Sequence, residues 1–399
     1  MNIYLFSYEF YNEDRTGLID GGLAHEYYKW AKQLLKLGHD VTIVSTSRGR
    51  FSCSVFDGIT VYELNPFNYF KKLISLLYKI GFVKGNETSK WHFVLNRGIQ
   101  LFLFFQNLKK RIDIVQYSSI VPIIDLKFIP NCVRIASYTK GYYEAYDIEP
   151  YNKDFDAAEN QMFRRNNFVF GPSKCIADAI KRELRLDKRI QIIETPFVRY
   201  TGDLDERYYN EIRGLDYVLF FGTLGRLKGC FDLAEIIYDV LDKYRDLYFV
   251  FVGKQVQWKD QWPIDFIKYK AKEYSGRIVY FDKMGHESLF PIVSGANFCL
   301  MPSRTENFSN TCVEAMSLNK IVLGSSPFFE QMIKDGETGF LCEAGDPQSM
   351  KNKIFQILSL SDSSRRIIEN NALKRVMRCN IVEKTDELVK YYKYVIRNS

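Results

Sequence analysis

The chain has 399 residues, of which 46% are hydrophobic and 16% aromatic, and it carries a formal net charge of +7. Its length favours two domains, and its many Tyr and Phe residues exclude a disordered or low-complexity protein. The eight cysteines form no CxxC pair, which argues against a zinc site and against a disulfide framework.

The N-terminus, MNIYLFSYEFYNEDR, turns acidic early and predicts a first strand instead of a signal peptide. No uninterrupted apolar run approaches the roughly 20 residues that a membrane-spanning helix needs. We therefore expect a cytoplasmic protein that is soluble or peripheral to the inner face of a membrane.

Short apolar segments alternate with helical patterns along the chain. In the first half, the predicted strands are 3–7, 41–45, 60–64, 114–118, 133–138, 168–173 and 190–194. In the second half, they are 217–222, 248–253, 278–282, 298–303 and 321–325. Apolar strands separated by helices indicate parallel sheets that are covered on both faces. The sequence thus predicts two doubly wound α/β domains in series.

The join between the domains is expected near 195–214, because this stretch is polar, contains Pro196 and precedes a new strand. The expected domains are 1–196 and 215–382, with 197–214 as the linker. A last helical pattern, near 383–397, follows the second domain. Ligands of open parallel sheets bind beyond the carboxyl ends of the strands, so the loops after strands are the expected binding sites.

The loop after the first strand ends in Gly21 and Gly22, just before a helical pattern over 23–37. Paired glycines let backbone N–H groups approach an anion, and the helix dipole adds attraction. A plain flexible loop explains the pair equally well. The GxGxxG fingerprint is absent, which argues against a nicotinamide enzyme.

The loop after 217–222 reads FFGTLGRLKGCFDL. Its glycines, beginning with Gly222, keep the turn open, and Arg226 and Lys228 add two cations. A diphosphate needs such cations, because Arg bridges two oxygens and Lys acts as a point charge. Taken alone, these residues also suit a solvated surface turn.

The segment PSRTENFSNTCVEAM, 302–316, follows a predicted buried strand and opens a helix expected over 307–318. Glu306 and Glu314 stand eight positions apart, and eight helical residues rise about 12 Å. The two carboxylates therefore cannot share one proton as a glycosidase pair does. Either they hold opposite ends of an elongated ligand, or they are an ordinary loop charge and an exposed helix residue.

Together these stretches resemble the family 4 glycosyltransferases, which have the GT-B fold. The family signature is two glutamates separated by seven residues and followed by Ala-Met, here Glu306 to Met316. The segments MPSRT, GTLGRLKG, FVGK and 330–346 match the family pattern as well. The resemblance implies two Rossmann-like domains facing across a cleft, a retaining reaction and no essential metal. It also implies that the C-terminal helix, about 383–399, packs back on the first domain.

The resemblance implies roles for individual residues. Glu306 would bind hydroxyls of the donor sugar, and Glu314 would bind the ribose of the nucleotide. Arg226 and Lys228 would neutralise the diphosphate as it leaves. Further donor contacts are expected at Gly22, Gly222, Lys254, Met284, Asn307, Phe308 and Ser309.

The chain departs from the family pattern at three places. Thr223 stands where many relatives have an arginine, so Arg226 would serve instead. The segment 137–146 lacks the histidine that touches the donor sugar in many relatives, and Lys140 is a candidate for that role. The sequence SSPFF, 325–329, replaces the glycine pair that usually precedes the position of Glu330.

A basic stretch lies between 65 and 112, where nine Lys or Arg residues stand against a single acidic residue. Basic, aromatic and amphipathic segments suit the anionic face of a membrane. No nucleic-acid recognition motif accompanies them, and a solvated helical face over an ordinary core is the alternative. The residues expected on the acceptor or membrane side are Lys71, Lys72, Lys109, Lys110 and Arg111.

The sequence thus predicts an enzyme, a retaining glycosyltransferase that needs no cofactor. It would move a hexose from a UDP- or GDP-sugar to a glycan or lipid-linked acceptor in bacterial surface polysaccharide synthesis. Two alternatives stay open: a nucleotide-sugar epimerase on the same fold, and a sugar-nucleotide-binding protein with impaired catalysis.

Overall fold

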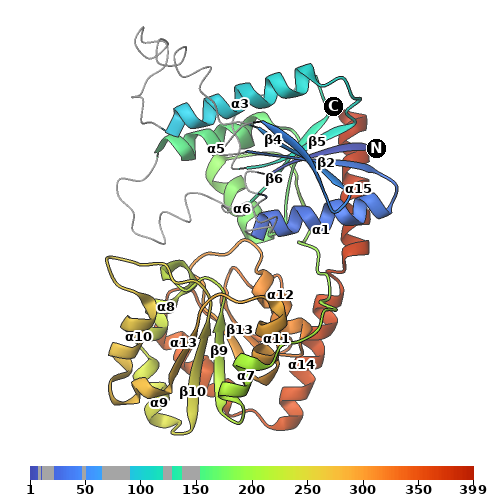
Figure 1. Cartoon of the computed structure of the whole chain (residues 1–399). Helices are drawn as coiled ribbons and strands as arrows, with labels where there is room; N and C mark the ends of the chain where they lie inside the picture. Colours follow the sequence, from blue (N-terminus) through green and yellow to red (C-terminus); the bar gives the residue numbers. More distant parts are fainter. Residues whose placement is uncertain (8–9, 11–21, 47–50, 65–89, 120–127, 137–152) are drawn as a thin grey trace. The chain divides into compact units, whose positions relative to one another are not determined.

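The computed structural model describes residues 1–7, 10, 22–46, 51–64, 90–119, 128–136 and 153–399. The chain divides into two compact units (Figure 1). The first unit contains the described residues up to Pro196 and the C-terminal segment 381–399, and the second contains 197–380.

The first unit is built on an eight-stranded sheet with the order β3-β4-β2-β1-β5-β6-β7-β8. All neighbouring strands are parallel except β3 and β4, which form an antiparallel hairpin at one edge. The strand bounds are β1 Asn2–Phe6, β2 Asp40–Thr46, β3 Ser52–Phe56, β4 Ile59–Leu64, β5 Ile114–Ser118, β6 Asn131–Arg134, β7 Val169–Gly171 and β8 Ile190–Ile192.

Helices cover both faces of this sheet. The helix bounds are α1 Gly22–Lys36, α3 Lys90–Asn107, α5 Lys153–Arg165, α6 Lys174–Leu184 and α15 Ile381–Asn398. Helices α1 and α15 share one hydrophobic core with strand residues such as Ile3 and Leu5. On the opposite face, Phe105 of α3 meets Tyr4 of β1 with ring centroids 5.8 Å apart. Successive side chains of β1 point to opposite faces of the sheet, so they pack against two different layers of helices.

The second unit is built on a six-stranded sheet with the order β11-β10-β9-β12-β13-β14, and every neighbouring pair is parallel. The strand bounds are β9 Asp216–Phe221, β10 Leu247–Val252, β11 Ile278–Phe281, β12 Phe298–Met301, β13 Val322–Ser326 and β14 Phe340–Glu343. The α-helix bounds are α7 Arg207–Ile212, α8 Cys230–Ala234, α9 Ile237–Lys243, α10 Pro263–Ala271, α11 His286–Gly295, α12 Asn310–Ser317, α13 Pro347–Leu358 and α14 Asp362–Met377.

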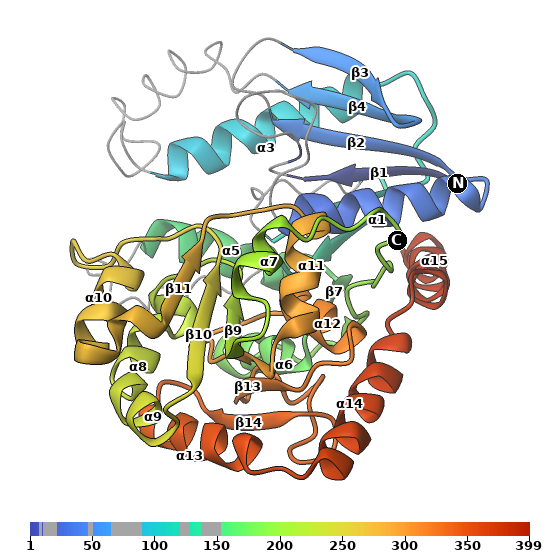
Figure 2. The same ribbon diagram turned by 60° about the horizontal axis from the view of Figure 1, so that its bottom comes forward.

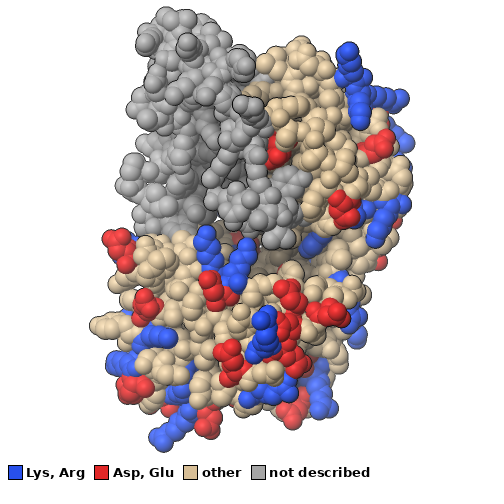
Figure 3. All heavy atoms as spheres, viewed as in Figure 1, with Lys and Arg blue, Asp and Glu red and all other residues tan. Residues whose placement is uncertain are grey.

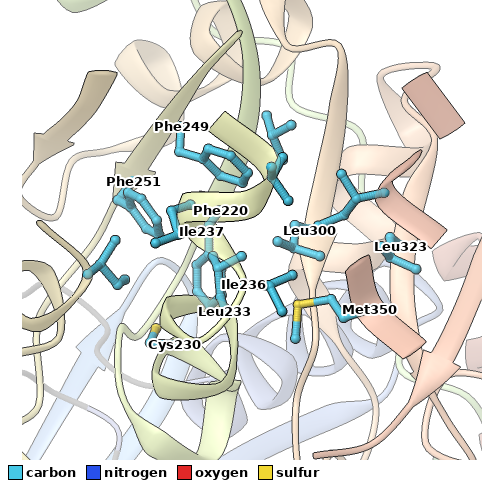
Figure 4. Close-up of a cluster of buried hydrophobic side chains, with 14 of the residues drawn as sticks. Phe220, Cys230, Leu233, Ile236, Ile237, Phe249, Phe251, Leu300, Leu323 and Met350 are labelled. Carbon is cyan, nitrogen blue, oxygen red and sulfur yellow. The ribbon is translucent and has the colours of Figure 1, made fainter. Parts of the chain in front are cut away.

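Two hydrophobic cores lie on the two faces of the second sheet. Alternate residues of β9 enter different cores: Phe220 packs with α8, α9, α10 and α13, whereas Leu219 packs with α7, α11, α12 and α14. Figure 4 shows the first of these cores, where Phe249 and Phe251 of β10 meet Leu233 and other residues of α8 and α9. Figure 2 shows the helices on either side of the strands. The two doubly wound parallel sheets confirm the predicted fold class.

The interval 197–214, which we expected to be a linker, belongs to the second unit and contains α7. Ile212 is buried against the core that α11 also lines. The described segment of the second unit begins and ends at neighbouring points, because the Phe197 backbone N–H donates to the Cys379 carbonyl at 2.7 Å. In the first unit, Tyr392 of α15 donates its hydroxyl to Gln116 of β5 at 2.5 Å.

Candidate functional site

The loops after β9 and β10 run side by side at the carboxyl edge of the second sheet. The Leu224 N–H donates to the Lys254 carbonyl at 2.8 Å. Gly222 and Gly253 both have positive φ, at 116° and 143°. A Cβ on Gly253 would lie 1.8 Å from the Gly222 carbonyl oxygen, so only glycine permits this approach. The predicted Gly222 loop is thus an open backbone turn held against a second loop.

Lys228 and Glu306, which lie 78 positions apart in the sequence, form an ion pair. Lys228 ends a short 3₁₀ turn, and the next residue, Gly229, packs against the carbonyl of Pro302. The Glu306 side chain is 14% exposed and that of Lys228 34%. The structure therefore brings together the predicted cation and the predicted sugar-binding carboxylate.

A second ion pair joins the same two loops. The Arg304 backbone N–H donates to the Leu227 carbonyl at 2.8 Å. The Arg304 guanidinium pairs with Asp232 of α8, with Nε 2.7 Å from Oδ2. The Asp232 carboxylate is buried, and an unpaired buried charge would destabilise the fold. The ion pair with Arg304 compensates for this charge. The loops that carry Lys228 and Glu306 are therefore tied together by both backbone and side chains.

Arg226 reaches the other side of its loop. Its guanidinium lies over the ring of Trp258, with Cζ 4.0 Å from the ring centroid. Trp258 begins a tight hairpin in which Lys259 and Asp260 both have positive φ. Since β9 lies between β10 and β12, the two cations of one loop contact the loops on opposite sides of it. From the sequence we expected Arg226 and Lys228 to act together on a diphosphate, and we assigned no role to Trp258.

Helix α12 begins at Asn310, three residues later than the sequence predicted. Ser309 caps the helix, because its side-chain oxygen accepts the Cys312 backbone N–H at 3.2 Å. Glu306 and Asn307 therefore lie in the preceding loop, where the Asn307 N–H donates to the Glu306 side chain at 3.1 Å. Phe308 packs against the core. Asn307, Phe308 and Ser309 thus lie just before the helix, and the Asn307 N–H already contacts Glu306.

Glu314 lies on α12 with its side chain 18% exposed. Its Oε1 lies 3.3 Å from Nε2 of His286, the first residue of α11. The sequence analysis assigned no role to His286. Its position in the sequence could have indicated a role at the site. His286 follows the end of a predicted strand and lies two residues after Met284, an expected donor contact.

The remaining predicted residues are found at several places. Gly22 is the first residue of α1 in the first unit. Lys254 is exposed next to Gly253, and Met284 packs against the second core. Lys109, Lys110 and Arg111 are exposed after α3. The residues that lie outside the described part of the chain are Gly21, Lys71, Lys72 and Lys140.

Two buried thiols close in sequence to the site residues are held in their neutral form. Burial raises the pKa of Cys312, and the negative charge of Glu306 raises it further. Burial also raises the pKa of Cys230, at the start of α8. Neither cysteine is therefore suited to act as a nucleophile at neutral pH.

Acidic and basic side chains are interspersed over the visible face of the second unit in Figure 3. A surface that binds a nucleic acid backbone normally has a continuous field of positive charge. The described residues on this face do not form one.

Residues 216–360 match the family model described as glycosyl transferases group 1. This segment is therefore similar to the domain of group 1 glycosyltransferases. It contains the loop of Lys228 and the loop and helix that carry Glu306 and Glu314.

Curated relatives resemble parts of this chain. An uncharacterised glycosyltransferase of Methanocaldococcus jannaschii is 25% identical over 49% of this chain and 52% of its own length. The capsular polysaccharide biosynthesis glycosyltransferase CapM of Staphylococcus aureus is 23% identical over 43% of this chain and 44% of its own length. The chain thus spans about half the length of the curated relatives it matches.

Solved structures resemble the whole chain. Sucrose-phosphate synthase of Thermosynechococcus elongatus covers 100% of both chains, with a TM-score of 0.77 and 15% identity. HepE of Anabaena, in a complex with UDP and glucose, covers 98% of both chains, with a TM-score of 0.65 and 14% identity. These likenesses show the fold, and it is the GT-B fold that the family resemblance implied.

Among the helices that the structure describes, none combines the length and the apolar character needed to cross a bilayer.

Proposed function

We propose that this group 1 glycosyltransferase moves a hexose, with retention of configuration, from a UDP- or GDP-sugar to a glycan or lipid-linked acceptor. The observation that carries the proposal is the meeting of Lys228 and Glu306 beyond the carboxyl ends of β9 and β12. The similarity to CapM supports a role in surface polysaccharide synthesis. The neighbours in complexes with UDP and with UDP-sugars support a nucleotide-sugar donor.

The charge of the leaving group explains why a lysine is needed. Transfer of the sugar releases a nucleoside diphosphate, and negative charge grows on its oxygens in the transition state. A fixed ammonium group and the N-terminus of α12 stabilise that charge without reorganisation. Lys228 would then exchange its contact with Glu306 for the diphosphate. Glu306, in turn, would accept hydrogen bonds from the sugar hydroxyls. This arrangement requires no cofactor.

The donor is identified first, by thermal shift with UDP-, GDP-, ADP- and CMP-sugars. Transfer is then measured for the wild type and for Glu306→Ala and Glu306→Gln, and NMR of the product gives its anomeric configuration. We expect both variants to lose transfer while their melting temperatures stay close to the wild-type value. Near-normal turnover by Glu306→Ala would contradict the role of this carboxylate, and an inverted product would contradict retention.

The same assay separates the alternative functions. An epimerase would convert the donor in the absence of any acceptor. A protein with impaired catalysis would bind the donor without turnover. Either result would replace the transferase proposal.

We also propose that the first unit contacts an anionic membrane surface. The described residues include exposed apolar side chains at Phe51, Val55, Leu103 and Phe128. Ring contacts continue from Phe51 to Tyr62 and on to Phe104 of α3, and from Phe128 to Phe102 of α3. The exposed cations at 109–111 follow the same helix. Apolar side chains near a cationic segment suit the interface of an anionic bilayer.

Flotation with liposomes tests this contact. We expect the protein to float with vesicles that contain phosphatidylglycerol and to be released by high salt, because the cations provide part of the attraction. Absence of salt-sensitive flotation would exclude the proposal.

A further inference from the structure

The contact between His286 and Glu314 joins two helices that follow different strands. Nε2 of His286, at the first position of α11, lies 3.3 Å from Oε1 of Glu314 on α12. The imidazole is 46% exposed, whereas the carboxylate is 18% exposed. This hydrogen bond uses one carboxylate oxygen, and within the described residues the second oxygen, Oε2, can accept a hydrogen bond from a ligand.

The imidazole is itself held in place by two other rings. Phe290, one turn later on α11, has its ring centroid 4.9 Å from that of His286. Tyr200 lies 6.1 Å from His286 and 5.5 Å from Phe290. The Tyr200 hydroxyl donates to the Asp203 carbonyl at 3.2 Å, which fixes that ring in turn. The Nε2 atom therefore occupies a position set by packing.

The first turn of α11 is anchored as well. The Asp205 backbone N–H donates to the Glu287 carbonyl at 2.9 Å, and the Ser288 hydroxyl donates to the Asp205 carboxylate at 3.1 Å. The residue that contacts Glu314 thus projects from a helix start that does not need to rearrange when a ligand arrives.

We propose that His286 is a positioning residue for nucleotide binding, which holds Oε1 of Glu314 so that Oε2 accepts a ribose hydroxyl. The inference rests on the proposed nucleotide-sugar donor and on the ribose-binding role that the family resemblance implies for Glu314. A free glutamate has several rotamers, and a ligand must select one of them on binding. Holding the side chain beforehand removes that loss, which corresponds to about two- to tenfold in affinity.

The sharpest test separates the hydrogen bond from the ring packing. His286→Phe keeps a ring against Phe290 and Tyr200 but removes the nitrogen, whereas His286→Gln keeps an N–H donor and removes the ring. Calorimetry would measure the dissociation constants of UDP and GDP and of their 2′- and 3′-deoxy forms. The ratio of deoxy to ribose constants reports on the hydroxyl contact, and melting temperatures report on folding.

We expect the wild type to prefer the ribose form by about tenfold or more, because a hydrogen bond to a carboxylate is charge-assisted. Glu314→Gln should lower that ratio. His286→Phe should lower it towards the Glu314→Gln value, with a near-normal melting temperature, and His286→Gln should retain most of it. A purely structural role of the imidazole would give the opposite order.

The outcomes for the inference and for the proposed function are distinct. If Glu314→Gln lowers the ratio and His286→Phe does not, the positioning role of His286 is wrong and that of Glu314 stands. If the wild type does not distinguish ribose from deoxyribose, the proposed role of Glu314 fails, and the inference fails with it. If the wild type binds neither nucleotide, the proposed donor class fails as well.

Discussion

Gly253 lies where the loops after β9 and β10 come closest. Replacement by Ala would place a Cβ 1.8 Å from the Gly222 carbonyl oxygen, at a φ of +143° that side chains rarely adopt. We expect Gly253→Ala to lower the free energy of unfolding by roughly 2–5 kcal/mol, because the loop must move and the backbone is strained. Urea unfolding measures this change.

Gly276→Ala is the matched control, since nothing lies within 4 Å of its Cβ position. It should unfold within roughly 0.5 kcal/mol of the wild type. Equal stability of the two variants would show that the loops are not held together as described.

Lys228 and Arg226 stand two positions apart but contact different partners, Glu306 and Trp258. We expect Lys228→Ala to lower kcat/KM by about 10- to 150-fold, which corresponds to the roughly 1.5–3 kcal/mol of a charge-assisted hydrogen bond. Arg226→Ala should have the smaller effect, because its guanidinium lies over the ring of Trp258, whereas Lys228 contacts Glu306. Steady-state kinetics with the identified donor gives both values, and a larger loss for Arg226→Ala would reverse this ranking.

The sequence predicted which residues lie at this edge of the sheet better than it predicted their contacts. Glu306 and Lys228 stand out because a charge after a strand end marks a loop at the binding edge of the sheet. The contacts of Arg226 with Trp258 and of Glu314 with His286 could not be predicted, because each joins loops or helices from different strands. Their geometry depends on the strand order and on the path of each loop.

At the scale of elements, Asp205 connects α7 to α11. Its carboxylate accepts hydrogen bonds from the Arg207 side chain and backbone and from Ser288, and these lower its pKa to about 2. The pKa of Asp205 in the folded protein is below its unfolded value of 3.8. The ionised Asp205 carboxylate therefore makes its full contribution to the free energy of unfolding above about pH 4. It is lost as the pH falls from about 4 towards 2.

Asp205→Asn should therefore lower the urea midpoint at pH 7, and the difference from the wild type should shrink as the pH falls below 4. Unfolding curves at pH 7, 4 and 3 measure this. A difference that stays constant with pH would show that the contact does not depend on the charge of Asp205.

Most strands were predictable because a parallel strand buried on both faces is a continuous apolar run. Two strands were not. β3 has three exposed residues in a row and so lacks the apolar pattern; its sequence signal is the hairpin turn Asp57–Gly58, where both φ values are positive. β14 has only four residues and ends in an exposed Glu343. The sequence predicted a start of α12 that is three residues too early. Ser309 caps the helix, and this is visible only from the contact of its side chain with the Cys312 N–H.

At the scale of the whole molecule, the C-terminal helix completes the first unit. Leu388, Tyr392 and Val395 of α15 are fully buried in the core that α1 also lines. Burying three such side chains contributes about 5–9 kcal/mol, which is comparable to the total stability of a domain.

Deletion of 381–399 should therefore unfold the first unit and leave 197–380 folded. Limited proteolysis followed by mass spectrometry would identify the protected fragment. Protection of 1–196 in the truncated protein would show that α15 is dispensable.

The return of the chain to the first unit at Ile381 has a consequence for biosynthesis. Residues 1–196 leave the ribosome early. One side of their hydrophobic core stays uncovered until α15, within residues 381–399, has been synthesised. The described residues of the second unit, 197–380, are continuous in sequence and are all synthesised before that helix. Apolar surface of the first unit therefore stays exposed while the second unit is synthesised. During that interval the nascent chain is most accessible to chaperones and proteases and most prone to self-association.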